Sequence, residues 1–212
     1  MSLFPIFLKL SGRACLVVGA GHIALAKIES LIRADADVHV LAPTALPEIE
    51  TLARSGVLRW TDRKYEKGDA CGSFLVIAAT DVADVNHSVY REAFDLGILC
   101  NVVDDPPYCD FYFPSVVQRG PLQIAISTEG ESPAVAQRLR RELDTKLPTD
   151  LGPWVQEMGK LRREVRAEHY ASRERTELLH LLAERPLCAL EECPTRQFAR
   201  EGKHVCSLQR VS

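Results

Sequence analysis

The stretch ACLVVGAGHIALAKIESLIRADADVHVLAP, residues 14–43, decides the expected fold. Its apolar run ACLVVG (14–19) ends in glycine, and the residues after it carry Ile23 and Leu31 on a helical spacing. A second apolar run, DVHVLA (37–42), follows. We therefore predict a strand, a tight turn, a helix and a second strand, the unit from which parallel sheets are built.

The turn has the spacing G-x-G-x-x-A, formed by Gly19, Gly21 and Ala24. The first glycine permits a tight turn, the second lets the backbone approach a pyrophosphate, and the alanine allows close helix packing. Amides at the start of the following helix can then bind the phosphates. This pattern favours a dinucleotide site, and the alternative is a turn with a structural role only.

The second strand ends in Leu41, Ala42 and Pro43, where a carboxylate for the ribose would be expected. We expect backbone groups around Pro43 and Thr44 to serve instead. Because no arginine stands there to meet a 2′-phosphate, NAD is favoured over NADP.

Further strands are predicted at 57–60, 73–80 and 97–103, with helical patterns between them, notably Val85 to Leu96. Residues 1–113 therefore read as a Rossmann-like α/β domain with a parallel sheet. The fourth strand ends in AATD (78–81), at the edge where such sheets bind ligands. We assign Thr80 and Asp81 to the cofactor, and the alternative for Asp81 is that it caps the next helix.

The pattern changes after Asp104. A turn-rich link, DDPPYCD (104–110), precedes two expected strands, FYFPSVVQ (111–118) and LQIAIS (122–127), and a helix that Ser132 caps and that ends before Pro148. We expect residues 114–149 to form a small α+β segment and residues 150–212 a helical C-terminal region. Within this region the sequence is helical in pattern to Glu184, and its periodicity is weak from Arg185 onward.

The composition is ordinary for a globular protein, with 46% hydrophobic and 26% charged residues and a net charge of −3. It favours neither a nucleic-acid partner nor a membrane, and we expect a cytoplasmic protein. The seven cysteines are scattered, so a disulfide framework is not expected. The spacing of Cys188, Cys193, His204 and Cys206 is not typical of zinc, so no metal site is predicted, and His87 is expected to be exposed.

Three further motifs stand in order after the glycine turn: NVVDD (101–105), FYFPSVV (111–117) and ISTEGESPAVAQRLRREL (126–143). With them, residues 1 to about 165 closely resemble the precorrin-2 dehydrogenase family, which also forms the N-terminal module of siroheme synthases. The resemblance implies NAD-dependent oxidation of precorrin-2 to sirohydrochlorin. In bifunctional members ferrous iron is then inserted. The resemblance also implies a homodimer, built largely by the segment after the nucleotide domain.

The resemblance implies site residues as well. The essential aspartate of the family matches Asp104, and its cofactor contacts match His22 and Ile23 after the glycines and Pro43 and Thr44 after the second strand. The family also lacks an acidic residue at that strand end. Since the substrate carries eight carboxylates, we expect it to meet amides, hydroxyls and a cation, assigned to Asn101, Ser127, Thr128, Gly130, Ser132 and Arg138.

Oxidation of precorrin-2 removes a hydride and a proton, so Asp104 could accept the proton or orient the substrate. The alternative is that Asp104 only caps the turn into Pro106. Two other functions stay open at this point, a non-catalytic NAD(H)-binding redox sensor and a carrier of sirohydrochlorin. The sequence also leaves open whether iron is inserted and which metal would be used.

Overall fold

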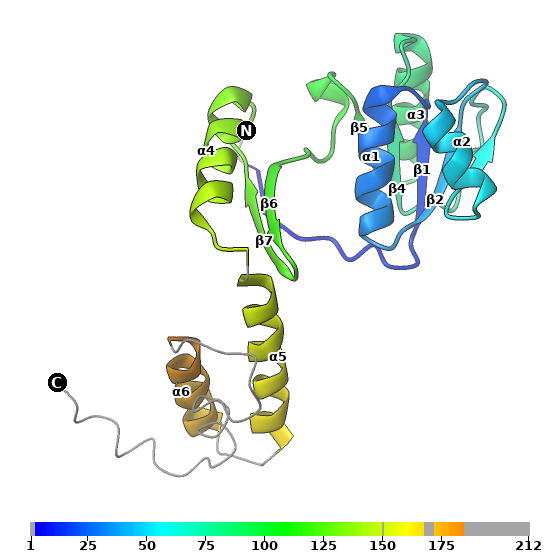
Figure 1. Cartoon of the computed structure of the whole chain (residues 1–212). Helices are drawn as coiled ribbons and strands as arrows, with labels where there is room; N and C mark the ends of the chain where they lie inside the picture. The colour runs from blue at the N-terminus through cyan, green and yellow to red at the C-terminus, as the bar shows by residue number, and fades with distance from the viewer. Residues whose placement is uncertain (1–2, 150, 168–171, 185–212) are drawn as a thin grey trace. The chain divides into compact units, whose positions relative to one another are not determined.

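The computed structural model describes residues 3–149, 151–167 and 172–184. These form two compact units, residues 3–113 and the residues from Pro114 onward (Figure 1). The predictions for the tail from Arg185, including the unusual cysteine and histidine spacing, lie outside the described residues.

The sheet of the first unit has five parallel strands in the order β3-β2-β1-β4-β5. The strands are Ala14–Val18 (β1), Asp37–Leu41 (β2), Arg59–Thr61 (β3), Leu75–Ala78 (β4) and Leu99–Val102 (β5). The helices are His22–Arg33 (α1), Pro47–Arg54 (α2) and Ala83–Asp95 (α3). The Rossmann-like α/β prediction is confirmed. The predicted third strand began two residues early, because the Val57 amide closes the turn after α2 by donating to Leu52.

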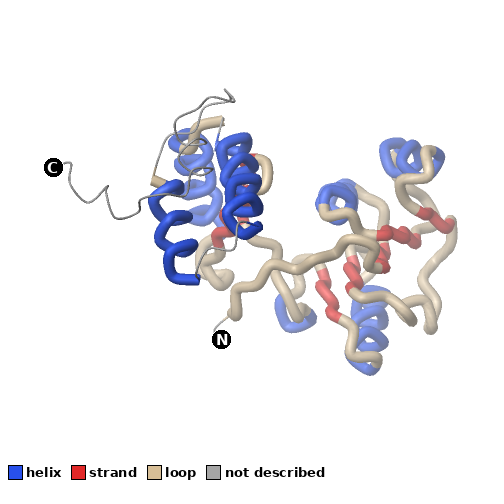
Figure 2. Tube along the Cα trace, turned by 90° about the horizontal axis from the view of Figure 1, so that it is seen from below, coloured by secondary structure: helices blue, strands red, loops and turns tan. Residues whose placement is uncertain are grey.

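Both faces of this sheet are buried, as expected for a parallel sheet covered by helices. On one face Cys15 and Val17 pack in a cluster with the buried residues of α1 and α2. On the other, Leu16 and Val18 pack with those of α3. Figure 2 shows helices on both sides of the strands of this unit. The near-continuous apolar runs of the sequence are thus explained by burial on two sides.

The strand order reverses direction at β1, which lies between β2 and β4. The chain leaves β1 through α1 to β2 on one side, and it later returns to β4 on the other. The carboxyl ends of β1 and β4 are therefore the point at which sheets of this class bind ligands.

The second unit contains a two-stranded antiparallel sheet, Ser115–Arg119 (β6) and Leu122–Ile126 (β7), and the helix Pro133–Lys146 (α4). The predicted strand from Phe111 begins only at Ser115, because the preceding residues form aromatic contacts within the first unit. Ser132 caps α4, and its hydroxyl accepts a hydrogen bond from the Val135 amide, as predicted.

The helical pattern predicted up to Glu184 corresponds to two helices, Leu151–Ala167 (α5) and Ser172–Ala183 (α6). They share a small apolar cluster of Leu161, Val165, Leu178 and Leu182. Gly152 of α5 lies against the turn between β6 and β7, where an added Cβ would stand 3.0 Å from the Arg119 carbonyl. A glycine is therefore needed for α5 to approach this hairpin.

The cysteines of the described part are free. Burial raises the pKa of the Cys15 thiol to about 11 and that of Cys100 to about 12, so both are protonated, apolar core groups. Among the described residues no helix is both long and apolar enough to span a membrane.

Candidate functional site

The glycine turn directly follows β1. Gly19 has a φ of 111°, and a Cβ added to it would lie 2.3 Å from the carbonyl oxygen of Ala79, after β4. The Gly19 amide donates to Leu41 O at 2.9 Å, and the Ala79 amide donates to Val18 O at 2.8 Å. Only glycine fits here, because the chain must turn between the ends of β2 and β4 without a side chain.

The start of α1 fits a phosphate. Gly21 is the N-cap and brings no side-chain acceptor, and no acidic residue stands in the first turn. Nothing lies within 4 Å of a Cβ built on Gly21, which is exposed together with His22 and Ile23. The first amides of a helix have no partner within it, so they are available to an anion in this open space.

The segment after β2 is joined to the glycine turn. Pro43 and Thr44 are exposed, and the Leu46 amide just beyond them donates to Ala20 O at 3.2 Å. Trp60 anchors the start of the segment, because its indole Nε1 donates to Ala42 O at 3.0 Å. The predicted contacts His22 and Ile23, at the start of α1, and Pro43 and Thr44, after β2, thus belong to two segments that the structure ties together.

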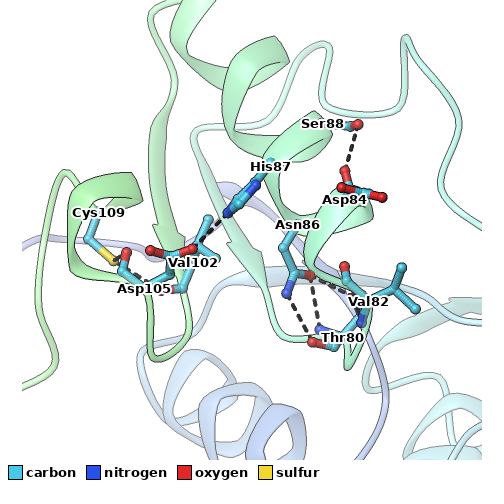
Figure 3. A network of polar contacts seen from close by, with 9 residues as sticks. All are labelled: Thr80, Val82, Asp84, Asn86, His87, Ser88, Val102, Asp105 and Cys109. Atoms are coloured by element: carbon cyan, nitrogen blue, oxygen red, sulfur yellow. Dashed lines mark hydrogen bonds and ion pairs between the residues drawn. The ribbon is translucent and has the colours of Figure 1, made fainter.

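At the end of β4, Thr80 is engaged by Asn86 of α3, a residue that the sequence analysis missed (Figure 3). Asn86 is buried; its Oδ1 accepts from the Thr80 amide at 3.2 Å and the Thr80 hydroxyl at 2.7 Å, and its Nδ2 donates to Thr80 O at 2.9 Å. Asp81 is exposed. The alternative that Asp81 caps α3 is wrong, because Val82 is the N-cap and α3 has no side-chain cap.

Asp104 follows β5 at this edge of the sheet. Its φ is 61°, and hydrogen bonds from Val103 N to Ala78 O and from Asp105 N to Val102 O fix the turn around it. Its side chain is exposed and accepts no hydrogen bond from any residue that the structure describes. The alternative that Asp104 caps the turn is therefore wrong.

The neighbouring Asp105 carries the polar contacts instead (Figure 3). Its Oδ2 lies 2.7 Å from Nε2 of His87, whose ring stacks on Tyr108 with centroids 4.1 Å apart. The prediction that His87 is exposed is wrong, since this side chain is only 25% exposed. Cys109 Sγ donates to Val102 O and Asp105 O at 3.0 and 3.3 Å, and its burial raises the pKa of this thiol. The backbone that presents Asp104 is thus held by a packed network.

Asn101, on β5, is buried. Its Nδ2 donates to Phe111 O at 2.8 Å and to Cys109 Sγ at 3.3 Å, and its backbone forms a bridge with Cys109. Both amide hydrogens thus hold the returning 109–111 segment. The substrate contact predicted for Asn101 stays a prediction.

Lys27 is a second residue that the sequence analysis did not single out. It lies on α1, half-buried, with Nζ 3.8 Å from the centroid of the Phe113 ring. Burial lowers the pKa of Lys27, and the charge of Asp104 acts against that shift. Lys27 and Asp104 thus influence one another electrostatically without forming an ion pair.

The remaining predicted ligands lie in the second unit. Ser127 and Thr128 hydroxyls accept from the amides of Glu129 and Ser132, so the Ser132 amide is already occupied. Gly130 has a φ of 88° in this turn. Arg138 is 64% exposed and lies 3.4 Å from Glu142 on the same helix.

Comparison with known proteins agrees with this geometry. A family model described as "Putative NAD(P)-binding" matches residues 6–115, and a second, described as "Sirohaem biosynthesis protein central", matches residues 119–145. A solved structure titled "SirC, precorrin-2 dehydrogenase" matches with a TM-score of 0.78 and 26% identity. The match covers 94% of this chain and 98% of that one.

Siroheme synthases are among the curated relatives. The protein from Photorhabdus laumondii is 40% identical over 175 residues, and siroheme synthase 1 from Cronobacter sakazakii is 44% identical over 162. These matches cover 82% and 76% of this chain but only 37% and 34% of the relatives, so the chain spans about a third of their length. Because the first model covers more than half of the chain, the chain belongs to this NAD(P)-binding family.

Proposed function

We propose that this chain is an NAD-dependent dehydrogenase that converts precorrin-2 to sirohydrochlorin. The observation that carries the proposal is Asp104, an exposed carboxylate without a hydrogen-bonding partner in the described residues, at the sheet edge that also holds the glycine turn. The likeness to SirC over nearly the whole of both chains supports the same assignment.

The cofactor would be held by the open start of α1 and the segment after β2. Amides of His22 and Ile23 would bind the pyrophosphate, and backbone groups of Pro43 and Thr44 would meet the ribose. The residues from Ala42 to Leu46 include no arginine for a 2′-phosphate, which favours NAD over NADP. Bound there, NAD would supply the acceptor for the hydride.

Asp104 would accept the proton that leaves precorrin-2 together with the hydride. Its exposure lets it pass that proton on to water. Its left-handed backbone costs about 1 kcal/mol, and such strain is concentrated at functional sites. Asp105, His87 and Cys109 would keep this turn rigid, so that the carboxylate does not have to be ordered when substrate arrives.

Insertion of ferrous iron into sirohydrochlorin is a second candidate reaction, with Fe²⁺ as a substrate. The same unpaired carboxylate favours it, because the pyrrole nitrogens must lose protons as the metal enters and Asp104 is free to accept them. No group of three or more metal-binding side chains exists among the described residues, so the proposal includes no resident metal.

We also propose a cytoplasmic homodimer built through the second unit. Two strands alone are marginally stable, and each strand of the β6–β7 sheet leaves one edge unpaired. Val116 on β6 is 41% exposed. A second copy of this segment would cover both the edge and the apolar side chain.

The test is an anaerobic assay in which freshly generated precorrin-2 is supplied with NAD or with NADP and the sirohydrochlorin spectrum is followed. We expect NAD-dependent product formation, with NADP less effective. Ferrous iron is then added, and a spectral shift faster than the protein-free control supports the chelatase. Folded protein that binds NAD without turnover would overturn the proposal in favour of a redox sensor. Tetrapyrrole binding without NAD dependence would indicate a carrier.

A further inference from the structure

The Lys27 ammonium of α1 is within electrostatic reach of Asp104 but has no hydrogen-bond acceptor among the described residues. Its Nζ stands over the Phe113 ring at 3.8 Å from the centroid, and the side chain is half-buried. It forms no hydrogen bond or ion pair with any residue that the structure describes. The carboxylate of Asp104 acts on Lys27 through its charge, in the direction that raises the pKa of the lysine.

An ammonium has three N–H donors, and an aromatic face satisfies the charge without accepting those hydrogen bonds in full. The partial burial of Lys27 lowers its pKa because water is removed from the charged form. A partly desolvated ammonium is stabilised when an anion with oxygen acceptors binds to it. The contact with Phe113 also orders the lysine side chain beforehand, which reduces the entropy lost on binding.

We propose that Lys27 is a binding site for a carboxylate of the tetrapyrrole substrate, with Phe113 as the platform that orients the ammonium. The inference rests on the proposed function, since precorrin-2 and sirohydrochlorin each carry eight carboxylates. It gives that substrate a fixed point within the first unit, which also holds the carboxylate that would take the proton.

Position along the helix favours a substrate carboxylate over a nucleotide phosphate. The phosphate site expected at a helix start involves the amides of His22 to Ala24. Lys27 comes five residues after His22, about 7.5 Å further along the helix axis. Its electrostatic partner is Asp104, which follows β5, and not the glycine turn that follows β1.

The experiment compares Lys27→Met, which keeps the length and the apolar stem, with Lys27→Arg and with the control Lys67→Met. Lys67 is exposed in the same unit, and its side chain forms no hydrogen bond or ion pair with the described residues. Sirohydrochlorin binding is measured by absorbance titration, NAD binding by fluorescence, and the KM for precorrin-2 from initial rates. Circular dichroism checks folding, and Lys27→Gln replaces Lys27→Met if the latter does not fold.

For Lys27→Met we expect sirohydrochlorin affinity to fall and the KM for precorrin-2 to rise by roughly tenfold each, as for loss of a partly buried charge contact. NAD affinity stays unchanged, and Lys27→Arg and Lys67→Met retain most of the substrate affinity. A loss of NAD affinity would overturn the inference by assigning the lysine to the phosphate. Unchanged affinity for both ligands would reduce it to a packing residue on Phe113.

The proposed function fails separately. Wild-type protein that binds sirohydrochlorin through Lys27 but does not oxidise precorrin-2 would overturn the dehydrogenase and support the carboxylate site. If wild-type protein oxidises precorrin-2 and Lys27→Met has the same sirohydrochlorin affinity and the same KM for precorrin-2, the dehydrogenase is supported and the carboxylate site is overturned.

Discussion

Each of the two units is stabilised by a different kind of interaction. The first, residues 3–113, buries both faces of a five-stranded sheet in two apolar clusters. Outside the small α5–α6 cluster, the described part of the second unit buries only Val117 and Ala136 among its apolar side chains, beside a sheet of two strands. The first unit can therefore be stable on its own core, whereas the second relies more on polar contacts.

Arg119 provides the main polar anchor of the second unit. Its guanidinium donates to Asp144 Oδ1 at 2.9 Å, to Asp144 O at 2.6 Å and to Leu147 O at 3.4 Å, which joins β6 to the end of α4. A cation at the C-terminus of a helix also meets the negative end of the helix dipole. Arg119 is thus committed to structure and is not available as a cation for the substrate.

The chain offers one probe in each unit. Trp60 lies in β3 and Trp154 in α5, and they are the only tryptophans. Single-tryptophan variants, Trp154→Phe and Trp60→Phe, therefore report unfolding of the first and of the second unit separately. The following predictions use these two backgrounds with urea unfolding.

The largest effect is expected for Gly19→Ala. The added Cβ would collide with Ala79 O at 2.3 Å, at a φ that side chains rarely adopt, and we expect a loss of at least about 3 kcal/mol in the first unit. Gly21→Ala is the control: nothing lies near its Cβ, so stability should hold while NAD affinity falls about tenfold. Equal stability losses in the two variants would contradict this account of the turn.

Asn86→Ala should lower the stability of the first unit by roughly 2 kcal/mol, because the half-buried amide and carbonyl of Thr80 lose their partner. The Trp60 transition should move to lower urea, and the Trp154 transition should not. Ser88→Ala on the same helix, which removes only an exposed hydroxyl contact to Asp84 O, is the matched control. A shift of both transitions would show that the units do not unfold independently.

Arg119→Met is the corresponding test for the second unit. We expect a loss of about 1–2 kcal/mol seen by Trp154 alone, because the carbonyls at the end of α4 lose charged donors. The control is Arg138→Met, whose exposed pair with Glu142 should contribute less than about 0.5 kcal/mol. If Arg138→Met cost as much as Arg119→Met, the anchor described above would be incorrect.

The smallest effect concerns Asp69, paired through both carboxylate oxygens with Arg63 at 2.7 and 2.6 Å. The hydrogen bond from Arg63 lowers the pKa of Asp69 below its ordinary 3.8. A carboxylate whose pKa is lowered in the folded state stabilises the fold fully at pH values above its ordinary pKa. This stabilisation is lost as the pH falls through the lowered pKa. Asp69→Asn should therefore destabilise the first unit at pH 7, and the loss of stability should be smaller at pH 3. The control Asp62→Asn, at an exposed position, should leave the stability unchanged at both pH values. The same destabilisation at both pH values would exclude the charge as its cause.

Local sequence patterns predicted most of the fold. Apolar runs between turn residues predicted every strand of the first unit, and Ser132 with Pro133 predicted the start of α4. Strand ends were less predictable because they depend on distant partners: the Phe111 carbonyl bonds Asn101, so the expected strand starts only at Ser115.

The sequence predicted the site residues that belong to one local motif. It did not predict those whose contacts come from segments distant in the sequence. Gly19 and Asp104 each follow a strand in a recognisable motif. Asn86, His87 and Lys27 act through residues that only the folded sheet brings near them, so neither helical periodicity nor residue type indicated their roles. An asparagine early in a predicted helix that follows a Thr-Asp strand end is the sequence signal that could have found Asn86.

The central claim is that Asp104 takes the proton while the glycine turn holds NAD. The measurement that tests it most directly is anaerobic turnover of precorrin-2 with NAD by Asp104→Asn, beside Asp95→Asn at the exposed end of α3 as control. NAD affinity is measured on the same samples. We predict a loss of turnover of at least about a hundredfold for Asp104→Asn with NAD affinity unchanged, and normal turnover for Asp95→Asn. Normal turnover by folded Asp104→Asn would contradict the account.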